Sequence, residues 1–203
     1  MHPSFFFLRK KQMPEELIDI VNNNDIVISQ ELRSIAHRHG LQHRGVHVLL
    51  VTLEGRLLVQ QRGKHQDTFP LALDCSVSEH VKAGESYRQA AERGLQEELG
   101  ISDVQLKSLI KLKMEYGPND FEICILYEGR ADPKLIHFDP LEVENVTSYH
   151  LDELVELIYN GEVAFTTWLV QIIRWYLDKP SELEVIEIYS HDRLLLSKGR
   201  NML

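Results

Sequence analysis

One stretch of the sequence constrains this chain more than any other: residues 84–101, which read GESYRQAAERGLQEELGI. It begins with a glycine and the carboxylate of Glu85, continues through strong helix formers, and closes on the neighbouring acids Glu97 and Glu98. Paired carboxylates at the end of a helix, with a third acid upstream, are oxygen ligands that suit a hard divalent cation. The stretch therefore predicts a helix that carries a metal site.

The same stretch resembles the Nudix signature, G-x5-E-x7-R-E-U-x-E-E-x-G-U, in which U is an aliphatic residue. Read from position 79, the residues in register are Glu85, Arg93, Leu95, Glu97, Glu98, Gly100 and Ile101. Two positions depart from the signature: Glu79 stands at its first glycine, and Gly94 replaces the glutamate after the arginine. In many hydrolases of that family this glutamate binds metal or acts as the base. The resemblance thus implies the fold and the metal-binding acids, and it leaves the base to another residue.

The resemblance extends beyond the signature, over roughly residues 16–177. Residues 43–47 (HRGVH), 57–62 (LLVQQR) and 68–70 (TFP) are similar to the Nudix branch that contains the type 1 isopentenyl-diphosphate isomerases and their hydrolase-like relatives. In those isomerases a divalent metal is held by three histidines and two acids. The residues of this chain that match them are His37, His43, His80, Asp120 and Glu122.

The types and spacing of these five residues are compatible with a metal site. Asp120 and Glu122 lie two apart in an expected strand, so their carboxylates share one face. His80 continues the face of Ser78 if that strand extends. Mixed imidazole and carboxylate ligands suit Mn²⁺, Zn²⁺ or Fe²⁺ better than an all-oxygen Mg²⁺ site does. Taken singly, the histidines are equally compatible with ordinary positions at helix ends and in strands.

The acids of the signature stretch form a second group of metal candidates, namely Glu85, Glu97 and Glu98. The resemblance implies that at least one of them is a ligand of Mg²⁺ or Mn²⁺, and that Glu85 and Arg93 support the others. Without the resemblance, Glu97 would be a solvated side chain in an i,i+4 pair with Arg93, which stabilises a helix by a few tenths of a kcal/mol.

Gly94 has no side chain with which to accept a proton, so the base has to come from elsewhere. The candidate catalytic residues are Glu98, Glu97 and Glu122, with Asp120 as a further candidate for taking the proton.

Binding of the diphosphate requires local basic groups. Arg62 and Lys64 are the candidates, although bases are common on any protein surface. The isomerases carry basic residues at the positions of Gln66 and Gly94, so this chain lacks two of their contacts.

Ser78 and Trp168 are the remaining substrate-binding candidates. The isomerases place a cysteine at the position of Ser78, and a hydroxyl is far less acidic than a thiol. Cys75 lies three residues away, and strand alternation turns it to the opposite face. Trp168 matches an isomerase aromatic that faces a cationic intermediate by cation–π attraction, and it is also compatible with a core position on the last helix.

Composition limits the partners of the chain. The formal charge of −9 over 203 residues argues against a general nucleic-acid or anionic-membrane binder. No apolar run approaches the roughly 18 residues that a membrane span requires. The two cysteines, Cys75 and Cys124, have no metal-binding spacing and favour a reducing, cytoplasmic setting. The expected partner is a small-molecule diphosphate.

The order of predicted elements indicates an α+β fold, a mixed sheet sandwiched between helices. The domain covers residues 16–178, residues 1–15 are an N-terminal extension that can be disordered, and residues 179–203 are a C-terminal extension. Expected strands cover residues 17–21, 26–29, 47–52, 57–61, 73–78, 104–114, 121–127 and a bulged 183–188. Expected helices cover residues 31–39, the signature stretch, 151–159 and 166–177. The last helix and the tail are candidates for pairing two subunits in a homodimer.

The leading functional hypothesis is a metal-dependent Nudix-type hydrolase of an organic diphosphate, most simply a nucleoside-linked one. One alternative is an enzyme that resembles isopentenyl-diphosphate isomerase. Another is a diphosphate-binding protein without turnover, because both standard catalytic residues of the family are substituted. The loops at residues 63–67, 117–120 and 131–140 contain no base-reading or sugar-reading pattern, so the sequence does not name the substrate.

Overall fold

The computed structural model of the chain describes residues 15–196. Ten strands of this part form one sheet: β1 (Leu17–Val21), β2 (Val27–Leu32), β3 (His43–Val51), β4 (Leu57–Arg62), β5 (Leu73–Asp74), β6 (Val77–His80), β7 (Lys107–Gly117), β8 (Asp120–Arg130), β9 (Val143–Tyr149) and β10 (Glu184–Ile188). The helices of this part are α1 (Arg33–His39), α2 (Tyr87–Leu99), α3 (Leu151–Asn160) and α4 (Thr167–Tyr176), with a short 3₁₀ turn at Pro133–Leu135. Within it, no helix is long and apolar enough to cross a bilayer.

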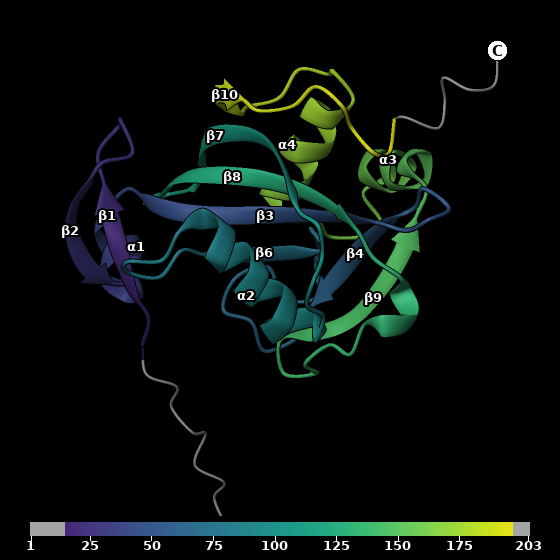
Figure 1. The fold of residues 1–203 in the computed structure, drawn as a ribbon, viewed down its shortest axis with the longest axis horizontal. Coiled ribbons are helices and arrows are strands. Elements are labelled where there is room, and N and C mark those ends of the chain that lie inside the picture. Colours follow the sequence, from purple (N-terminus) through teal and green to yellow (C-terminus); the bar gives the residue numbers. More distant parts are fainter. Residues whose placement is uncertain (1–14, 197–203) are drawn as a thin grey trace, which may run out of the picture.

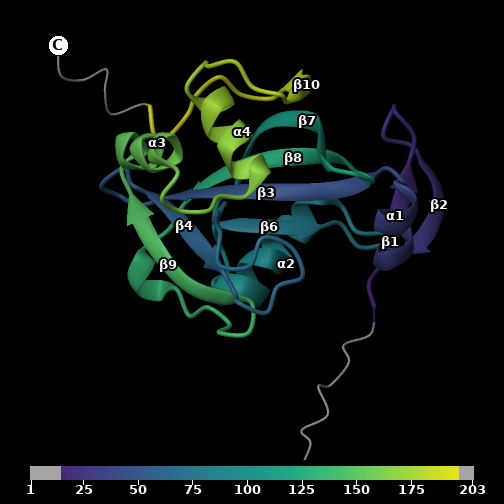
Figure 2. The same ribbon diagram turned by 180° about the vertical axis from the view of Figure 1, so that it is seen from behind.

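The sheet is mixed, and helices cover both of its faces. Its main path runs β10-β7-β8-β3-β1-β2, in which β3 and β8 are parallel neighbours, while β4 links β3 to β5 and β9. Figures 1 and 2 show α2 on one face and α4 on the other. Each helix covers a separate hydrophobic core. Leu95 and Leu99 of α2 pack in one core, and Leu169 and Ile172 of α4 pack in the other. The predicted α+β architecture is confirmed.

The signature stretch forms α2, as predicted. Ser86 and Gln89 make a capping box at its start, in which each residue's side chain satisfies the other's backbone. The helix ends at Gly100, whose φ of 65° is in the left-handed region. The helix therefore begins and ends on signals within its own sequence, and the acids near its C-terminal end are held in a fixed place.

Several strand ends differ from the prediction: β3 begins at His43 instead of residue 47, and β2 continues to Leu32, where the helix was expected. Two larger differences concern whole segments. The strand expected over residues 73–78 is interrupted at Cys75 and Ser76, where the Ser76 hydroxyl accepts from Leu50 N and donates to Leu58 O in place of a strand partner. Strand β9 was not expected at all, because its segment, VENVTSY, lacks apolar alternation. It forms because it pairs along β4.

The C-terminal strand β10 does form, on the edge strand β7. Its pairing register shifts between Val185 and Glu187, where the sequence pattern slips out of phase, so the predicted bulge is confirmed. The expectation of a disordered N-terminal extension falls almost wholly on residues 1–14, which lie outside the described part.

Candidate metal and diphosphate site

The structure brings together all five residues predicted to share a metal. His37 lies in the last turn of α1, His43 begins β3 and His80 ends β6, while Asp120 and Glu122 open β8. Parallel pairing of β3 and β8 sets His43 opposite Glu122. Antiparallel pairing of β3 and β6 sets His80 opposite Gly45, two residues after His43. Possible ligand atoms of the three histidines lie within 4.8 Å of one another, as do those of His43 and the two acids.

The contacts within this histidine–acid group are short. The Nε2 atoms of His37 and His80 are 3.1 Å apart, and His37 Nδ1 is 3.3 Å from Asp120 Oδ1. Glu122 Oε1 lies between two rings, 3.4 Å from His43 Nε2 and 3.5 Å from His80 Nε2. One carboxylate oxygen and several imidazole nitrogens therefore converge on one small volume.

Two polar atoms of this group fit a bound cation. His43 Nδ1 is 2.9 Å from the carbonyl oxygen of Leu41, which fixes the ring with its Nε2 lone pair turned to the acids. Both His43 Nε2 and Asp120 Oδ1 are buried without a hydrogen-bond partner among the described residues. Orphaned acceptors at a mixed imidazole and carboxylate cluster are what a divalent transition metal would satisfy.

The charge state of the group also suits a metal. Burial lowers the pKa of His80 well below its ordinary value, so its ring is neutral and can offer a lone pair. Burial by itself would raise the pKa of Glu122, but the His43 ring 3.4 Å away and the positive charge that the neighbouring imidazoles carry when protonated outweigh it and hold that pKa low. A neutral His80 beside an ionised Glu122 has the protonation states that metal ligands require. Burial lowers the pKa of His43, but its contact with Glu122 outweighs burial and raises that pKa, so a metal bound there would displace a proton.

Gly45 makes room for this group, and sequence reasoning did not identify it as a site residue. A Cβ at Gly45 would overlap the Oε2 oxygen of Glu122 and lie 2.9 Å from Cys124 Sγ. Only a glycine lets the Glu122 side chain lie flat across β3 at this point.

The acids of the signature stretch form a second group, centred on Arg93. Its Nε atom is 3.0 Å from Glu85 Oε1, while its Nη1 atom is 3.0 Å from Glu97 Oε2 and 3.1 Å from Glu79 Oε2. Its Nη2 atom donates to the carbonyl oxygen of His80 at 2.8 Å. One guanidinium thus faces three carboxylates and ties α2 to the strand that carries His80.

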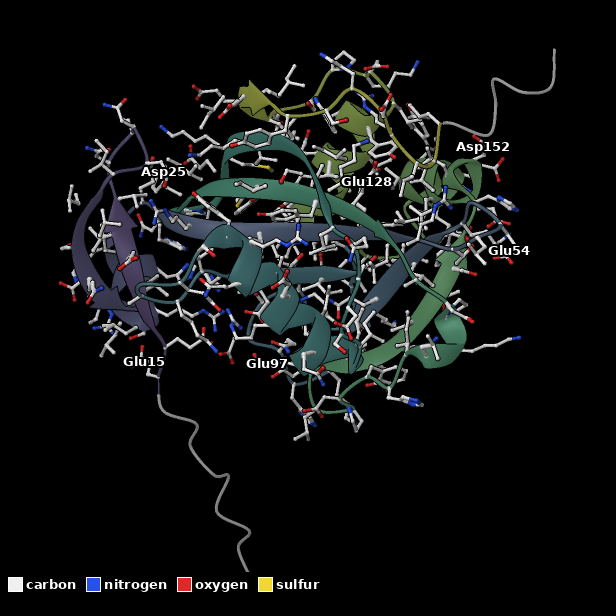
Figure 3. All side chains as sticks on the ribbon, viewed as in Figure 1. Glu15, Asp25, Glu54, Glu97, Glu128 and Asp152 are labelled. Atoms are coloured by element: carbon white, nitrogen blue, oxygen red, sulfur yellow. The ribbon has the colours of Figure 1, made fainter. Side chains whose placement is uncertain are left out.

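The remaining acid of the signature, Glu98, is buried beneath α2. Only 5% of it is exposed, and its Oε2 accepts a 2.7 Å hydrogen bond from the Gln60 amide. Burial raises the pKa of Glu98 well above its ordinary value, and the negative charge of Glu79 adds to the shift. Glu97 is exposed on the same helix, as Figure 3 shows, with Lys82 Nζ 3.8 Å away.

The second group also includes two acids that were not predicted as site residues, Glu79 and Glu142. Burial raises the pKa of Glu79 to about 7 despite its ion pair with Arg93. Burial also raises the pKa of Glu142, in the loop before β9, and the charges of Asp139 and Glu97 add to the effect. Glu79 could have been noticed as a carboxylate adjacent to His80, but Glu142 is brought here only by the fold.

The two groups lie on different faces of β6. Ser78 and His80 point to one face and Glu79 to the other, because strand side chains alternate. Glu79 pairs with Val46, which packs in the core beneath α2. The eight predicted metal residues therefore divide into a histidine–acid group and a signature-acid group.

Three of the four substrate-binding candidates, Arg62, Ser78 and Trp168, meet on one buried residue, Asp74. Its side chain accepts hydrogen bonds from Arg62 Nη1 at 3.0 Å and from Ser78 Oγ at 3.1 Å, and also from the indole of Trp168. Asp74 is fully buried. Lys64, in contrast, is exposed in the loop after β4. No sequence pattern marks Asp74, which is one polar residue of an alternating strand.

Trp168 is largely buried, as the core interpretation predicts. The rings of Phe69 and Tyr116 lie 5.2 and 5.3 Å from it, and His47 stacks at 6.3 Å. His47 is 3.1 Å from Ser78 Oγ and 2.7 Å from the Tyr116 hydroxyl, so it connects Ser78 to this aromatic wall. A role for Trp168 in binding a cation stays a prediction.

Known proteins confirm the fold and the signature. A family model for the NUDIX domain matches residues 41–169, more than half of the chain. The chain is 32% identical to isopentenyl-diphosphate delta-isomerase 2 of Homo sapiens, with 83% of this chain and 86% of that protein covered. It is 31% identical to an uncharacterized Nudix hydrolase of Nostoc sp. (strain PCC 7120), with 79% of this chain and 95% of that protein covered.

A solved structure resembles the whole fold. The crystal structure of DR0079 from Deinococcus radiodurans superposes with a TM-score of 0.68 at 28% identity, and the match covers 79% of this chain and 98% of that one. A mixed sheet between helices, with a carboxylate-rich helix held by an arginine, defines a Nudix fold. The chain belongs to the Nudix family.

Proposed function

We propose that this protein is a metal-dependent hydrolase of an organic diphosphate, with nucleoside-linked diphosphates as the substrate class. The observation that carries the proposal is the signature-acid group: Glu97 and Glu98 next to each other on α2, with Arg93 holding Glu85 and Glu97. Family membership and hydrolase relatives support it.

Each residue of the group has a definite part in this reaction. Glu97 and Glu98 would hold Mg²⁺ or Mn²⁺, and Arg93 would keep Glu85 and Glu97 in place. The ion would neutralise the phosphate charge and lower the pKa of the attacking water. If Glu97 and Glu85 hold the ion, Glu98 is the candidate base, because burial raises its pKa above that of an ordinary carboxylate.

The surroundings favour a small ligand in a reducing compartment. A net charge of −9 disfavours binding of nucleic acid or an anionic membrane, so the few local bases, Arg62 and Lys64, have to meet the diphosphate together with metal ions. Both cysteines are free and buried, which supports a cytoplasmic setting. A homodimer paired through α4 would use its exposed residues only, because much of α4 is buried against the sheet.

The proposal is tested by incubation with a panel of nucleoside diphosphates, sugar nucleotides and dinucleotides in Mg²⁺ or Mn²⁺. We expect phosphate or nucleotide release from at least one class. The matched control is the double variant Glu97→Gln/Glu98→Gln, which keeps the shape of the helix. Release no faster than that of the double variant across the panel would refute hydrolysis.

The histidine–acid group favours a second candidate, an isomerase of isopentenyl diphosphate or a related allylic compound. The human relative is named as such an isomerase, and the five residues that the resemblance implied for the metal lie together. Ser78 in place of cysteine weighs against it. Solvent deuterium entering the substrate in the presence of Mn²⁺ would support isomerisation, and no exchange would exclude it.

A third candidate, binding without turnover, has its own readout. A ligand-induced, metal-dependent thermal shift with neither product nor exchange would favour a binding protein over both enzymes.

A further inference from the structure

A second cluster of possible metal ligands lies beside the histidine–acid group. His47 of β3 and Glu122 and Cys124 of β8 each offer one ligand atom, and these three atoms lie within 4.8 Å of one another. All three residues are buried. The spacing of the two cysteines in the chain did not predict this cluster, because it forms only when β3 and β8 pair.

The hydrogen bonds around His47 determine which of its ring nitrogens can accept a metal. The Ser78 hydroxyl donates its hydrogen to Asp74 Oδ1 at 3.1 Å, since a carboxylate can only accept. His47 Nδ1, 3.1 Å from the same Ser78 oxygen, therefore carries a hydrogen and donates it. The Nε2 atom keeps its lone pair, on the side where the Tyr116 hydroxyl lies 2.7 Å from it and 3.3 Å from Cys124 Sγ. A ring nitrogen oriented by a hydrogen bond from the other nitrogen is the usual arrangement of a metal-binding histidine.

The other two ligand atoms of the cluster meet over Gly45. Cys124 Sγ is 3.1 Å from Glu122 Oε2, and a Cβ at Gly45 would overlap that oxygen and lie 2.9 Å from the sulfur. Only a glycine leaves this space open. The oxygen of Glu122 that faces His43 and His80 is the other one, Oε1. One carboxylate therefore presents one oxygen to the histidine–acid group and one to the cluster of His47 and Cys124.

We propose that His47 Nε2, Glu122 Oε2 and Cys124 Sγ bind a divalent transition metal, and Zn²⁺ is the ion that suits them best. A set of imidazole, carboxylate and thiolate ligands favours Zn²⁺ over Mg²⁺ and Mn²⁺. On binding, the Cys124 S–H bond breaks, a metal–sulfur bond forms, and the proton is released to solvent. His47 Nε2 exchanges its hydrogen bond from Tyr116 for the ion. The site lies apart from the signature acids, so it goes beyond the proposed hydrolysis and does not depend on it.

Titration of the chelator-treated protein with Co²⁺ tests the site without any substrate. Co²⁺ accepts the same ligands as Zn²⁺, and a thiolate bound to it gives a near-ultraviolet charge-transfer band that oxygen and nitrogen ligands do not give. We expect this band in the wild type, and we expect added Zn²⁺ to abolish it by displacing Co²⁺. Cys124→Ser should lose the band. Cys75→Ser, which removes the other buried cysteine, is the matched control and should keep it.

Two further variants separate this site from the histidine–acid group. His47→Gln should weaken the Co²⁺ affinity measured from the band by roughly tenfold or more. His80→Gln, which removes a ligand of the histidine–acid group only, should leave the band in place. Absence of the band in the wild type with Co²⁺ in excess would overturn the inference, and this result requires no variant to fold. A band that persists in Cys124→Ser, or that His80→Gln abolishes while His47→Gln does not, would overturn it too.

Discussion

Among single residues, Glu98 destabilises the metal-free fold because its carboxyl group is buried, although the proposed function requires that group. Its carboxyl group is buried and has one hydrogen-bond donor, the Gln60 amide, and a nearby carboxylate, Glu79. Burying a charge without a cation costs free energy, and the raised pKa expresses that cost. A bound cation, as the proposed function requires, would compensate this charge.

We therefore predict that Glu98→Gln stabilises the metal-free protein at high pH. The native pKa of Glu98 lies above the unfolded value near 4.5, so its contribution to stability falls as pH rises from there toward the native pKa. At pH 8 in the presence of a chelator, the free energy of unfolding of Glu98→Gln should exceed that of the wild type. The difference should be about 1.4 kcal/mol for each pH unit by which burial raises the pKa of Glu98. Near pH 4 the two proteins should be equal.

Urea unfolding at the two pH values measures this difference. An equal or lower stability of Glu98→Gln at pH 8 would show that the buried carboxyl is not a cost to the fold. The same variant should lose hydrolysis and metal binding, which separates its effect on stability from its effect on function.

At the scale of elements, the contact between α2 and β6 sets the geometry of the signature acids. Gly94 would ordinarily be a weak point, because glycine inside a helix destabilises by roughly 0.5–1 kcal/mol relative to alanine. Here the packing of Val77 and Glu79 against it requires the glycine.

Gly94→Ala should therefore destabilise the protein despite the better helix propensity of alanine. We expect a net loss of about 1–2 kcal/mol, since overpacking costs roughly 1–3 kcal/mol and propensity returns less than 1. The double variant Glu79→Gly/Gly94→Ala should recover part of it, because the contact with Val77 remains. Thermal and urea unfolding measure both, and a more stable single variant would contradict the packing described here.

Elements with local signals were predictable from the sequence, and those that depend on distant partners were not. The sequence of α2 contains both its N-terminal capping box and the glycine that ends it. The side chain of Asn22 accepts hydrogen bonds from two backbone N–H groups and thereby marks the β1–β2 turn. Strand β9 has no alternation and exists through its pairing with β4. The family resemblance predicted the histidine–acid group. The roles of Asp74 and Gly45 were not predictable from the sequence, because contacts between neighbouring strands set them.

At the scale of the whole molecule, the C-terminal residues are part of the fold as far as residue 196. Strand β10 pairs with β7. Glu128 of β8 is fully buried, and it accepts from Leu194 N at 3.0 Å and from the Tyr176 hydroxyl at 2.9 Å. Leu183, Val185 and Leu195 pack against the core under α4. Their distance from the signature-acid group, on the other face of the sheet, makes their role one of stability.

Truncation after Lys179 should accordingly destabilise the protein. Loss of the Leu194 donor alone leaves a buried carboxylate less satisfied, at a cost of about 1–3 kcal/mol, and exposure of apolar surface adds to it. Tyr176→Phe, which removes the hydroxyl that donates to Glu128 and accepts from Leu195 N, is the milder comparison. Urea unfolding measures both, and an unchanged midpoint on truncation would mean that residues 180–203 are an independent extension.

The central claim of the proposed function, that the signature acids of α2 hold a cation apart from the histidine–acid group, is tested most directly by anomalous diffraction from crystals soaked in Mn²⁺. We predict a peak beside Glu97 and Glu98, distinct from any peak at His43, His80 and Glu122. A map with Mn²⁺ only at the histidines, or with no Mn²⁺ beside α2, would contradict the claim.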